Sequence, residues 1–308
     1  MASDTQSSRG VYRFAVATSC VTILLLMAGA LVTSNNAADS VPDWPLAYGK
    51  LVPPLVGGIR FEYTHRVLAA LVSIMTLTLA VWLMKAEKRP LARKLGWTAL
   101  ALVIAQALLG GVRVLVGHPA ISATAHAILA QIYFLTIVGL SLYLSPWWQR
   151  DLPQFDEGSS GARAFAFWTT MAILAQLVLG AAFRHGAFGI APHLVGAGVV
   201  TVMVIMTGRA VKYNFSDVPD LRRGVALLHS FFGIQILLGG AAYWEVLKAG
   251  DNFQPTLGYV LLTVAHVLGG ALLLASSVLL TLMCYRLIHP LSVADSSGAR
   301  LAGRTTAG

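Results

Sequence analysis

The feature that most limits the fold of this chain is a series of long apolar segments. Each comes close to, or exceeds, the roughly 20 residues that an α-helix needs to cross the hydrocarbon core of a bilayer. Only 11% of the 308 residues are charged, against about 25% in soluble domains, and the period-two alternation of membrane β-strands is absent. We therefore predict an all-α integral membrane protein with eight transmembrane helices, at residues 14–33, 65–84, 95–116, 121–144, 164–183, 191–207, 225–243 and 257–282.

The distribution of charge predicts the orientation of these helices. The net charge is +9, and sixteen of the 22 Lys and Arg residues fall in the terminal segments and in alternate connections on the same side. Because cytoplasmic segments carry the excess of Lys and Arg, we predict that both termini are cytoplasmic. Nucleic-acid binding would need a clustered, exposed basic face, and the sequence contains none, so we predict membrane lipid and no nucleic acid as a partner.

A polar connection and an internal repeat divide the chain into two halves. The connection at 145–163 is the longest on the cytoplasmic side, and we place an N-terminal four-helix half at 1–150 and a C-terminal four-helix half at 151–308. The third, fifth and seventh segments repeat a glutamine followed four residues later by a glycine: AQALLGG (105–111), AQLVLGA (175–181) and IQILLGG (234–240). Small residues at helix contacts explain the glycines equally well, whereas a duplicated bundle explains the whole pattern.

Four histidines lie on the even-numbered helices, all in the outer half of the membrane. They are His65, His126, His193 and His266, and a small residue follows each at four positions: Ala69, Ala130, Ala197 and Gly270. Small residues next to a histidine leave room for a flat macrocycle, and imidazole is the usual axial ligand of heme iron in helical bundles. We therefore predict two heme-sized sites, one between His65 and His126 and one between His193 and His266.

Other uses of these histidines fit less well. A zinc or non-heme iron site favours carboxylates beside the histidines, yet the apolar segments supply almost none, and Glu62 stands at the entry of one helix only. His118 and His185 lie in outer connections, where they could contact a propionate. A histidine-based proton relay in a transporter lacks the same intramembrane carboxylates.

The long outer segment between the first two helices carries the most specific pattern. The runs PDWPLAYG (42–49) and FEYTHR (61–66), together with QALLGGVRVL (106–115) and the histidines, resemble the heme A synthase family. The resemblance implies an eight-helix protein of two similar halves in the bacterial inner membrane. It implies an oxidoreductase that converts the C8 methyl group of heme O to the formyl group of heme A, by two successive hydroxylations.

The resemblance also implies roles for individual residues and partners. Glu62 is the catalytic residue, His65 and His126 ligate the substrate heme, and His193 and His266 ligate a heme b in the C-terminal half. Heme O synthase and cytochrome c oxidase assembly become expected partners, and the sequence leaves a homo-oligomer open. Many bacterial members carry a cysteine pair around the PDWPL segment, whereas Val41 and Ala47 stand here, and the two cysteines, Cys20 and Cys284, lie in apolar segments. A disulfide in this loop is therefore excluded.

The spacing within the FEYTHR run suggests how its charged residues are used. Glu62 precedes His65 by one helical turn, so its carboxylate could accept a proton or orient water beside the ligand. Arg66, Arg113 and Arg184 lie at outer helix ends, where a guanidinium can pair with a heme propionate or simply extend to the interface. The alternative function is a diheme cytochrome b-type electron-transfer protein, which would explain the histidines but not Glu62 or the PDWP loop.

Overall fold

The computed structural model contains eight long helices, which confirms the predicted class. The structure describes the chain except for residues 1, 118, 250–253 and 291–308. Within this part, all eight helices are long and apolar enough to cross a membrane. They are α1 (Ala2–Ser34), α2 (Ile59–Ala86), α3 (Pro90–Val116), α4 (Ala120–Leu144), α5 (Ala162–Arg184), α6 (Ala191–Asn214), α7 (Pro219–Ala249) and α8 (Leu257–Leu287).

Most helices extend beyond the apolar segments that predicted them. α1 starts at Ala2 rather than at residue 14, and α2 starts at Ile59 rather than at residue 65. The reason is that the apolar run marks the part of a helix inside the hydrocarbon, whereas backbone hydrogen bonding continues into polar and charged turns outside it. The early start of α2 places Glu62 in its first turn.

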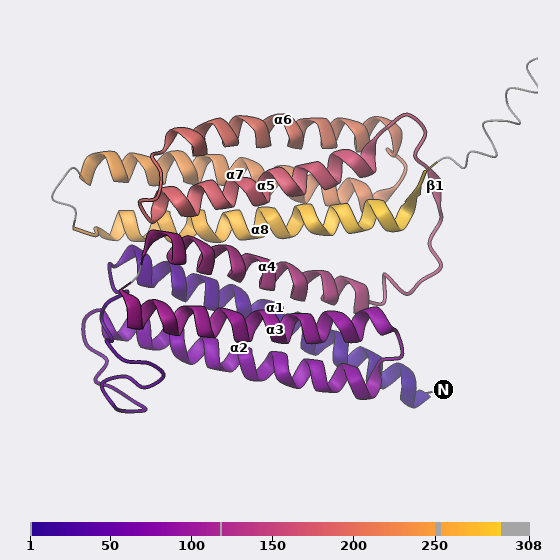
Figure 1. Cartoon of the computed structure of the whole chain (residues 1–308). Helices are drawn as coiled ribbons and strands as arrows, with labels where there is room; N and C mark the ends of the chain where they lie inside the picture. The colour runs from indigo at the N-terminus through magenta and orange to yellow at the C-terminus, as the bar shows by residue number, and fades with distance from the viewer. Residues whose placement is uncertain (1, 118, 250–253, 291–308) are drawn as a thin grey trace, which may run out of the picture.

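The helices form two layers, α1–α4 and α5–α8 (Figure 1). Consecutive helices pack as hairpins, and the layers meet where α8 contacts α1 and α4 and where α4 contacts α5. In its most apolar stretch α8 is 56% buried and α7 only 11% buried, because α8 lies between the layers and α7 at the edge. The first turn of α1 and the last turn of α8 lie at one end of the bundle (Figure 1); that this end is cytoplasmic stays a prediction.

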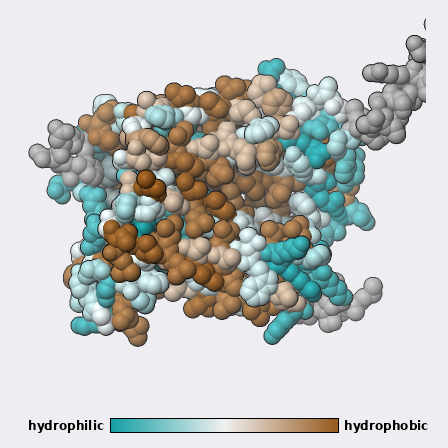
Figure 2. Space-filling view, in the orientation of Figure 1, coloured by the Kyte–Doolittle hydropathy of each residue, from teal (hydrophilic) through white to brown (hydrophobic). Residues whose placement is uncertain are grey.

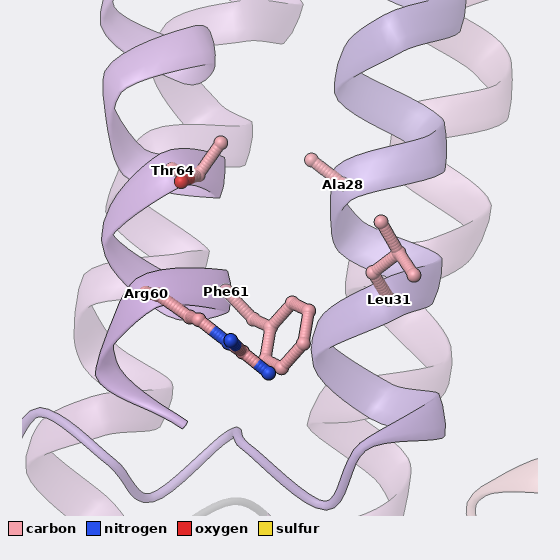
Figure 3. Close-up of a pocket in the computed structure, with 5 residues that line it drawn as sticks. All are labelled: Ala28, Leu31, Arg60, Phe61 and Thr64. Atoms are coloured by element: carbon pink, nitrogen blue, oxygen red, sulfur yellow. The ribbon is translucent and has the colours of Figure 1, made fainter. Parts of the chain in front are cut away.

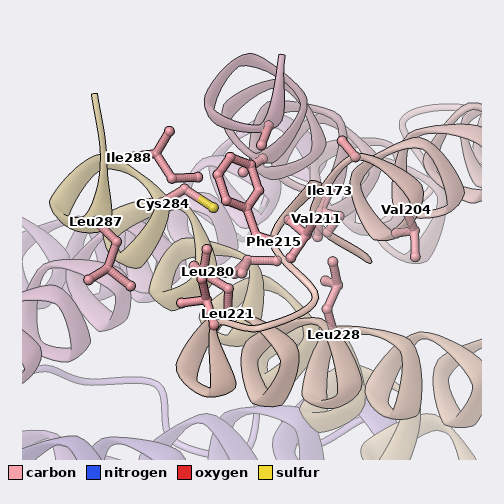
Figure 4. Packing of buried hydrophobic residues seen from close by; sticks show 14 of the residues in the cluster. Ile173, Val204, Val211, Phe215, Leu221, Leu228, Leu280, Cys284, Leu287 and Ile288 are labelled. Carbon is pink, nitrogen blue, oxygen red and sulfur yellow. The ribbon is translucent and has the colours of Figure 1, made fainter. Parts of the chain in front are cut away.

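Each layer has its own apolar core, and two small clusters join them. The larger core gathers side chains of α5–α8 around Phe215, Leu221 and Leu280 (Figure 4). Between the layers, Ala30 of α1 packs against α8, and so does Phe134 of α4. On the face that Figure 2 shows, hydrophobic residues occupy the middle of the molecule and hydrophilic residues gather towards its ends, as expected for a chain that spans a bilayer.

Hydroxyl groups connect the helices inside the bundle. Ser34 of α1 lies 2.8 Å from Thr263 of α8, and Thr170 of α5 lies 2.8 Å from Ser277 of α8. Interhelical hydrogen bonds of this kind hold membrane helices together where the hydrophobic effect between helices is weak. They join α8 to α5 of its own layer and to α1 of the other.

A short strand pair, which the apolar pattern does not predict, lies at the end of the bundle opposite the α1–α2 loop. β1 (Phe155–Asp156) pairs in parallel with β2 (Ile288–His289). Both strands lie outside the membrane-spanning helices, so the constraint that excludes open sheets from lipid does not apply. In the same connection the indole Nε1 of Trp147 donates to Asp220 Oδ2 at 2.8 Å, which ties the chain between the halves to the start of α7.

Candidate functional site

The four helix histidines share one packing arrangement. Each ring lies against a glycine of the preceding helix, so that a Cβ atom on the glycine would come within about 3 Å of the ring carbon Cε1. The pairs are Gly29 with His65 at 3.1 Å, Gly110 with His126 at 3.1 Å, Gly180 with His193 at 2.8 Å, and Gly239 with His266 at 2.9 Å. The glycines of the repeated motif therefore make room for the histidine rings, which is a more specific role than helix packing.

The polar atoms of these rings fit a ligand that binds imidazole. In all four histidines Nδ1 is buried and has no hydrogen-bond partner among the described residues. The backbone carbonyls of Leu25, Gln176 and Gln235 lie beside the rings of His65, His193 and His266, respectively. A carbonyl near one ring nitrogen favours the tautomer that leaves the other nitrogen free to bind a metal.

The C-terminal pair is brought together as predicted for a two-ligand site. The rings of His193 and His266 lie 6.3 Å apart, centre to centre, at an angle of 88°. Two imidazole–metal bonds of about 2 Å each, together with the distance from each nitrogen to its ring centre, give a separation of this order. Within the described residues there is no group of three His, Cys, Asp or Glu side chains suited to a metal, and a heme iron, bound by its porphyrin, needs only such axial ligands.

The N-terminal pair converges near an arginine. His65 of α2 and His126 of α4 are close enough to influence each other electrostatically, and Arg113 of α3 acts on both. Nε of Arg113 is buried without a hydrogen-bond partner among the described residues. A buried, unpaired guanidinium N–H beside two histidines is suited to an anionic group.

Glu62 lies in the first turn of α2, but its carboxylate is directed at the outer loop. It is 5% exposed. Oε2 accepts a hydrogen bond from the backbone N–H of Val41 at 2.9 Å, and Oε1 forms an ion pair with Nη2 of Arg66 at 2.6 Å. The sequence predicts that Glu62 is one turn from His65, which the start of α2 allows, but it does not predict this second set of partners.

Arg66 anchors the loop. Nη1 donates to the carbonyls of Asp43 at 2.7 Å and Leu46 at 2.9 Å, and Nη2 donates to the carbonyl of Val41 at 3.3 Å and to Glu62. Four of the five N–H donors of a guanidinium are thereby used. The predicted contact between Arg66 and a propionate would therefore use the remaining N–H, on Nε, or replace one of these bonds.

The loop itself is held in a defined turn. The Asp43 carboxylate accepts hydrogen bonds from the backbone N–H groups of Gly49 at 2.7 Å and Tyr48 at 2.6 Å, and the bond from Gly49 is the main reason that the pKa of Asp43 is lowered. Tyr48 and Gly49 have φ angles of 54° and 67°, in the left-handed region that favours glycine. The Trp44–Pro45 peptide bond is cis.

The loop also covers part of the bundle near the N-terminal histidines. A Cβ atom on Gly111 would lie 2.6 Å from Cδ2 of Trp44, so the indole lies on α3 next to Gly110, which contacts His126. Val41 and Ala47 are 1% and 2% exposed. The loop around residues 41–47 contains no cysteine. It is held by the burial of these apolar side chains and by the hydrogen bonds from Arg66.

Basic groups gather at the ends of α3 and α5 that carry Arg113 and Arg184. Nη2 of Arg184 donates to Ser34 Oγ at 2.7 Å and to the Ala30 carbonyl at 3.2 Å, so this arginine reaches from α5 to α1. His185 follows α5, and burial, with the charges of Arg184 and Arg113, lowers the pKa of His185 to about 4. His118 lies outside the described residues.

A small pocket between α1 and α2 was not predicted. Its volume is about 200 Å³, and it is lined by Ala28, Leu31, Arg60, Phe61 and Thr64 (Figure 3). The guanidinium of Arg60 lies 4.7 Å from the centre of the Phe61 ring at the mouth of the pocket. Apart from Arg60 and Thr64 the lining is apolar.

All three repeated glutamines contact a histidine residue, two of them at its backbone carbonyl and Gln235 at the ring nitrogen Nε2 of His266, 3.4 Å away. Nε2 of Gln106 donates to the backbone carbonyl of His126 at 3.0 Å, and Nε2 of Gln176 donates to that of His193 at 2.8 Å. The sequence shows the glutamine repeat but not its partner, because the rotation of one helix relative to the next cannot be derived from spacing within one helix.

These features together describe a helical protein of the multi-pass membrane type, with four histidines packed on glycines and two of those histidines close together. The family model of COX15-CtaA, described as cytochrome oxidase assembly protein, matches residues 59–192. The matched segment covers less than half of the chain, which resembles this family over that length. The matched segment contains Glu62, His65 and His126 and ends one residue before His193.

Curated relatives agree with this resemblance. The chain is 30% identical to the heme A synthase of Alkalihalophilus pseudofirmus over 184 residues, which are 56% of this chain and 59% of that protein. It is 33% identical to the heme A synthase of Lysinibacillus sphaericus over 140 residues, 44% of this chain and 46% of that protein. The chain thus spans about half the length of these relatives. A heme A synthase of Exiguobacterium sibiricum is 24% identical over 276 residues, 81% of this chain and 89% of that protein.

Proposed function

We propose that this protein is a heme A synthase, which oxidises the C8 methyl group of heme O to a formyl group. The observation that carries this proposal is the family match over residues 59–192, which includes a buried carboxylate one helical turn from a histidine seated on glycine. The conversion removes four electrons from the methyl carbon. Each of two successive hydroxylations would add one oxygen atom and pass two electrons to an external electron acceptor, and the resulting geminal diol would lose water to give the formyl group.

The substrate heme O would bind in the N-terminal half, with His65 and His126 as the ligands of its iron. Gly29 and Gly110 leave the space in which the two rings lie, and apolar helix surfaces suit a porphyrin with a farnesyl tail. Arg113, with its unpartnered Nε, is the candidate partner for a propionate on this side.

Glu62 would serve as the proton-transferring group of the N-terminal site. Its carboxylate is buried, and the backbone N–H of Val41 and the guanidinium of Arg66 both donate to it. To receive a proton or orient water at the substrate, one oxygen must exchange its present partner for the substrate side. Arg66 would hold the loop during this exchange, so we assign Arg66 to the loop before a propionate.

The C-terminal half would hold heme b between His193 and His266. The ring separation of 6.3 Å and the glycines behind both rings fit two axial ligands on one iron. Bound there, the heme would supply a one-electron redox centre. Arg184, which lies at the outer end of α5 between the layers, would pair with a propionate.

The cellular setting follows from the same proposal. A multi-pass protein of this family would lie in the bacterial cytoplasmic (inner) membrane with both termini inside. Heme O synthase would supply the farnesylated substrate, and assembly of cytochrome c oxidase would use the product. A 1–150 substrate half and a 151–308 heme b half remain our division of the chain.

Pigment analysis tests the proposal. The full chain is expressed beside a heme O-producing enzyme, and extracted hemes are separated by chromatography. We expect heme A with the wild type and its loss, with heme O accumulating, in Glu62→Ala. Glu62→Gln should behave alike, because an amide cannot take the proton.

Two controls separate the proposal from its rival. Arg60→Ala, which removes an exposed charge two residues from Glu62, should leave heme A formation intact. If the wild type binds heme b that quinol can reduce, but forms no heme A, then a diheme electron-transfer protein is the correct interpretation.

A further inference from the structure

The repeated glutamines occupy equivalent positions beside the histidines. Each precedes by four residues the glycine that contacts the histidine ring, so both lie on one helix face. Gln106 and Gln176 donate to the backbone carbonyls of His126 and His193, while Nε2 of Gln235 lies 3.4 Å from Nε2 of His266. Oε1 of all three is buried without a hydrogen-bond partner among the described residues.

The position of Gln176 depends on a second glycine. A Cβ atom on Gly196 would clash with Oε1 of Gln176 and would lie 3.3 Å from its Cδ. Gly196 follows His193 by three residues, so the carboxamide lies on the helical turn that carries the histidine. Gly269, three residues after His266, has the same relation to Oε1 of Gln235. The sequence suggests that these glycines leave room for a macrocycle, whereas the structure fills the space beside them with the glutamine amides.

We propose that Gln176 is a positioning residue for His193, and that Gln106 has the same role for His126. Gly180 fixes the ring of His193 from one side, and the Gln176 amide fixes its backbone carbonyl. Two contacts from the same face of α5 therefore limit both the position of the residue and the rotation of its ring. Groups that orient a metal-binding histidine commonly change its affinity for the metal. The inference rests on the heme b site proposed above.

The first helix pair lacks this contact. Leu25 stands four residues before Gly29, and a leucine side chain cannot donate to a carbonyl. The turn of α2 that carries His65 is held instead through Glu62 and Arg66, which bind the outer loop. His65, the histidine without a glutamine contact, thus lies in the half assigned to the substrate heme, which must be exchanged. Both histidines of the heme b half have a glutamine side chain nearby.

The test measures how firmly heme b is held and how its ligands are oriented. The full chain is purified from cells that make heme b alone, in a His65→Ala background so that the signal reports on the C-terminal pair. Gln176→Met keeps the side-chain length but removes the N–H donor. We expect heme transfer to excess apomyoglobin to be about tenfold faster, the lower end of such effects, and the low-spin ferric EPR signal to shift or broaden.

Two further variants make the result specific. Gly196→Ala should displace the carboxamide while leaving Gln176 in the chain, and should give the same change. Gln149→Met removes an amide that donates to the backbone carbonyls of Leu144 and Ser145, at the other end of the bundle, and should match the background. Thermal unfolding of the heme-free forms should be alike in all variants.

The outcomes separate the two proposals. If Gln176→Met and Gly196→Ala both keep the background transfer rate and EPR signal, while His193→Ala loses heme b, the positioning role is wrong and the heme site stands. If His193→Ala retains heme b, or the background protein binds none, the heme b site is wrong and the positioning role falls with it.

Discussion

At the scale of single residues, the contact between each helix histidine and a glycine limits which side chains can replace that glycine. A Cβ atom added to the glycine would lie near 3 Å from the histidine ring in all four pairs. A histidine ring packed against the helix backbone cannot move aside as the end of a long, flexible side chain can. Overpacking of this kind typically costs about 1–3 kcal/mol. Neighbouring glycines without such contacts provide a direct comparison.

Gly239→Ala and Gly240→Ala form a matched pair on α7. A Cβ on Gly239 would lie 2.9 Å from the His266 ring, whereas one on Gly240 would meet nothing within 4 Å. We expect Gly239→Ala to lose most bound heme b in a pyridine hemochrome assay. Gly240→Ala should keep it and gain up to about 1 kcal/mol in stability, because alanine favours a helix over glycine. Equal heme content in the two variants would contradict the packing argument.

At the scale of elements, the helices could be predicted from the sequence and the contacts between them could not. Apolar runs of bilayer length locate all eight helices, because the hydrocarbon core demands both length and composition. The pairing of His193 with His266 follows from their shared depth. The contact of Glu62 with Arg66 is an i,i+4 pair on α2, but its contact with Val41 does not follow from any pattern. Val41 belongs to an irregular loop whose path depends on Arg66 bonding three carbonyls.

The α1–α2 loop should respond to pH through Asp43. Its pKa is lowered by hydrogen bonds from the backbone of Gly49 and Tyr48, so it lies below the about 3.9 of an unperturbed aspartate. A lowered carboxyl pKa stabilises the folded loop above the unfolded-state value, and this stabilisation is lost as the pH falls through the folded-state pKa. We expect the amides of Tyr48 and Gly49 to lose protection from hydrogen exchange, corrected for intrinsic rates, as the pH falls from 5 towards 3 (roughly the range around that aspartate pKa).

Asp43→Asn is the control for this pH effect. Asparagine does not titrate, so the protection of the same two amides should be low at every pH and nearly constant across the range. A wild-type loop whose corrected exchange does not change between these pH values would show that the Asp43 carboxylate does not hold the turn.

At the scale of the whole molecule, a few polar side chains near the outer end join the two layers. Ser34 of α1 receives a hydrogen bond from Arg184 of α5 and lies 2.8 Å from Thr263 of α8. The apolar contacts of Ala30 and Phe134 with α8 accompany it. One buried serine of α1 therefore contacts two helices of the opposite layer, α5 and α8.

Ser34→Ala should weaken the association of the layers. It leaves the Arg184 guanidinium short of a partner in a buried position, and hydrogen bonds to charged groups contribute about 1.5–3 kcal/mol. We expect a lower thermal unfolding temperature in detergent. Thr78→Ala, which removes an exposed hydroxyl bonded only to the Ile74 carbonyl of its own helix, should change little; an equal effect of both would mean that Ser34 does not join the layers.

The outer loop, finally, is held against α2 by hydrogen bonds and by no covalent link within the described residues. A disulfide in this loop could be opened only by an electron donor. The hydrogen bonds from Arg66 to the carbonyls of Val41, Asp43 and Leu46 break and form reversibly without one. Trp44 can therefore leave α3 and return by thermal motion alone, as loops of low local stability do. A large flat guest could be admitted and released at the outer surface at a rate independent of the redox conditions there.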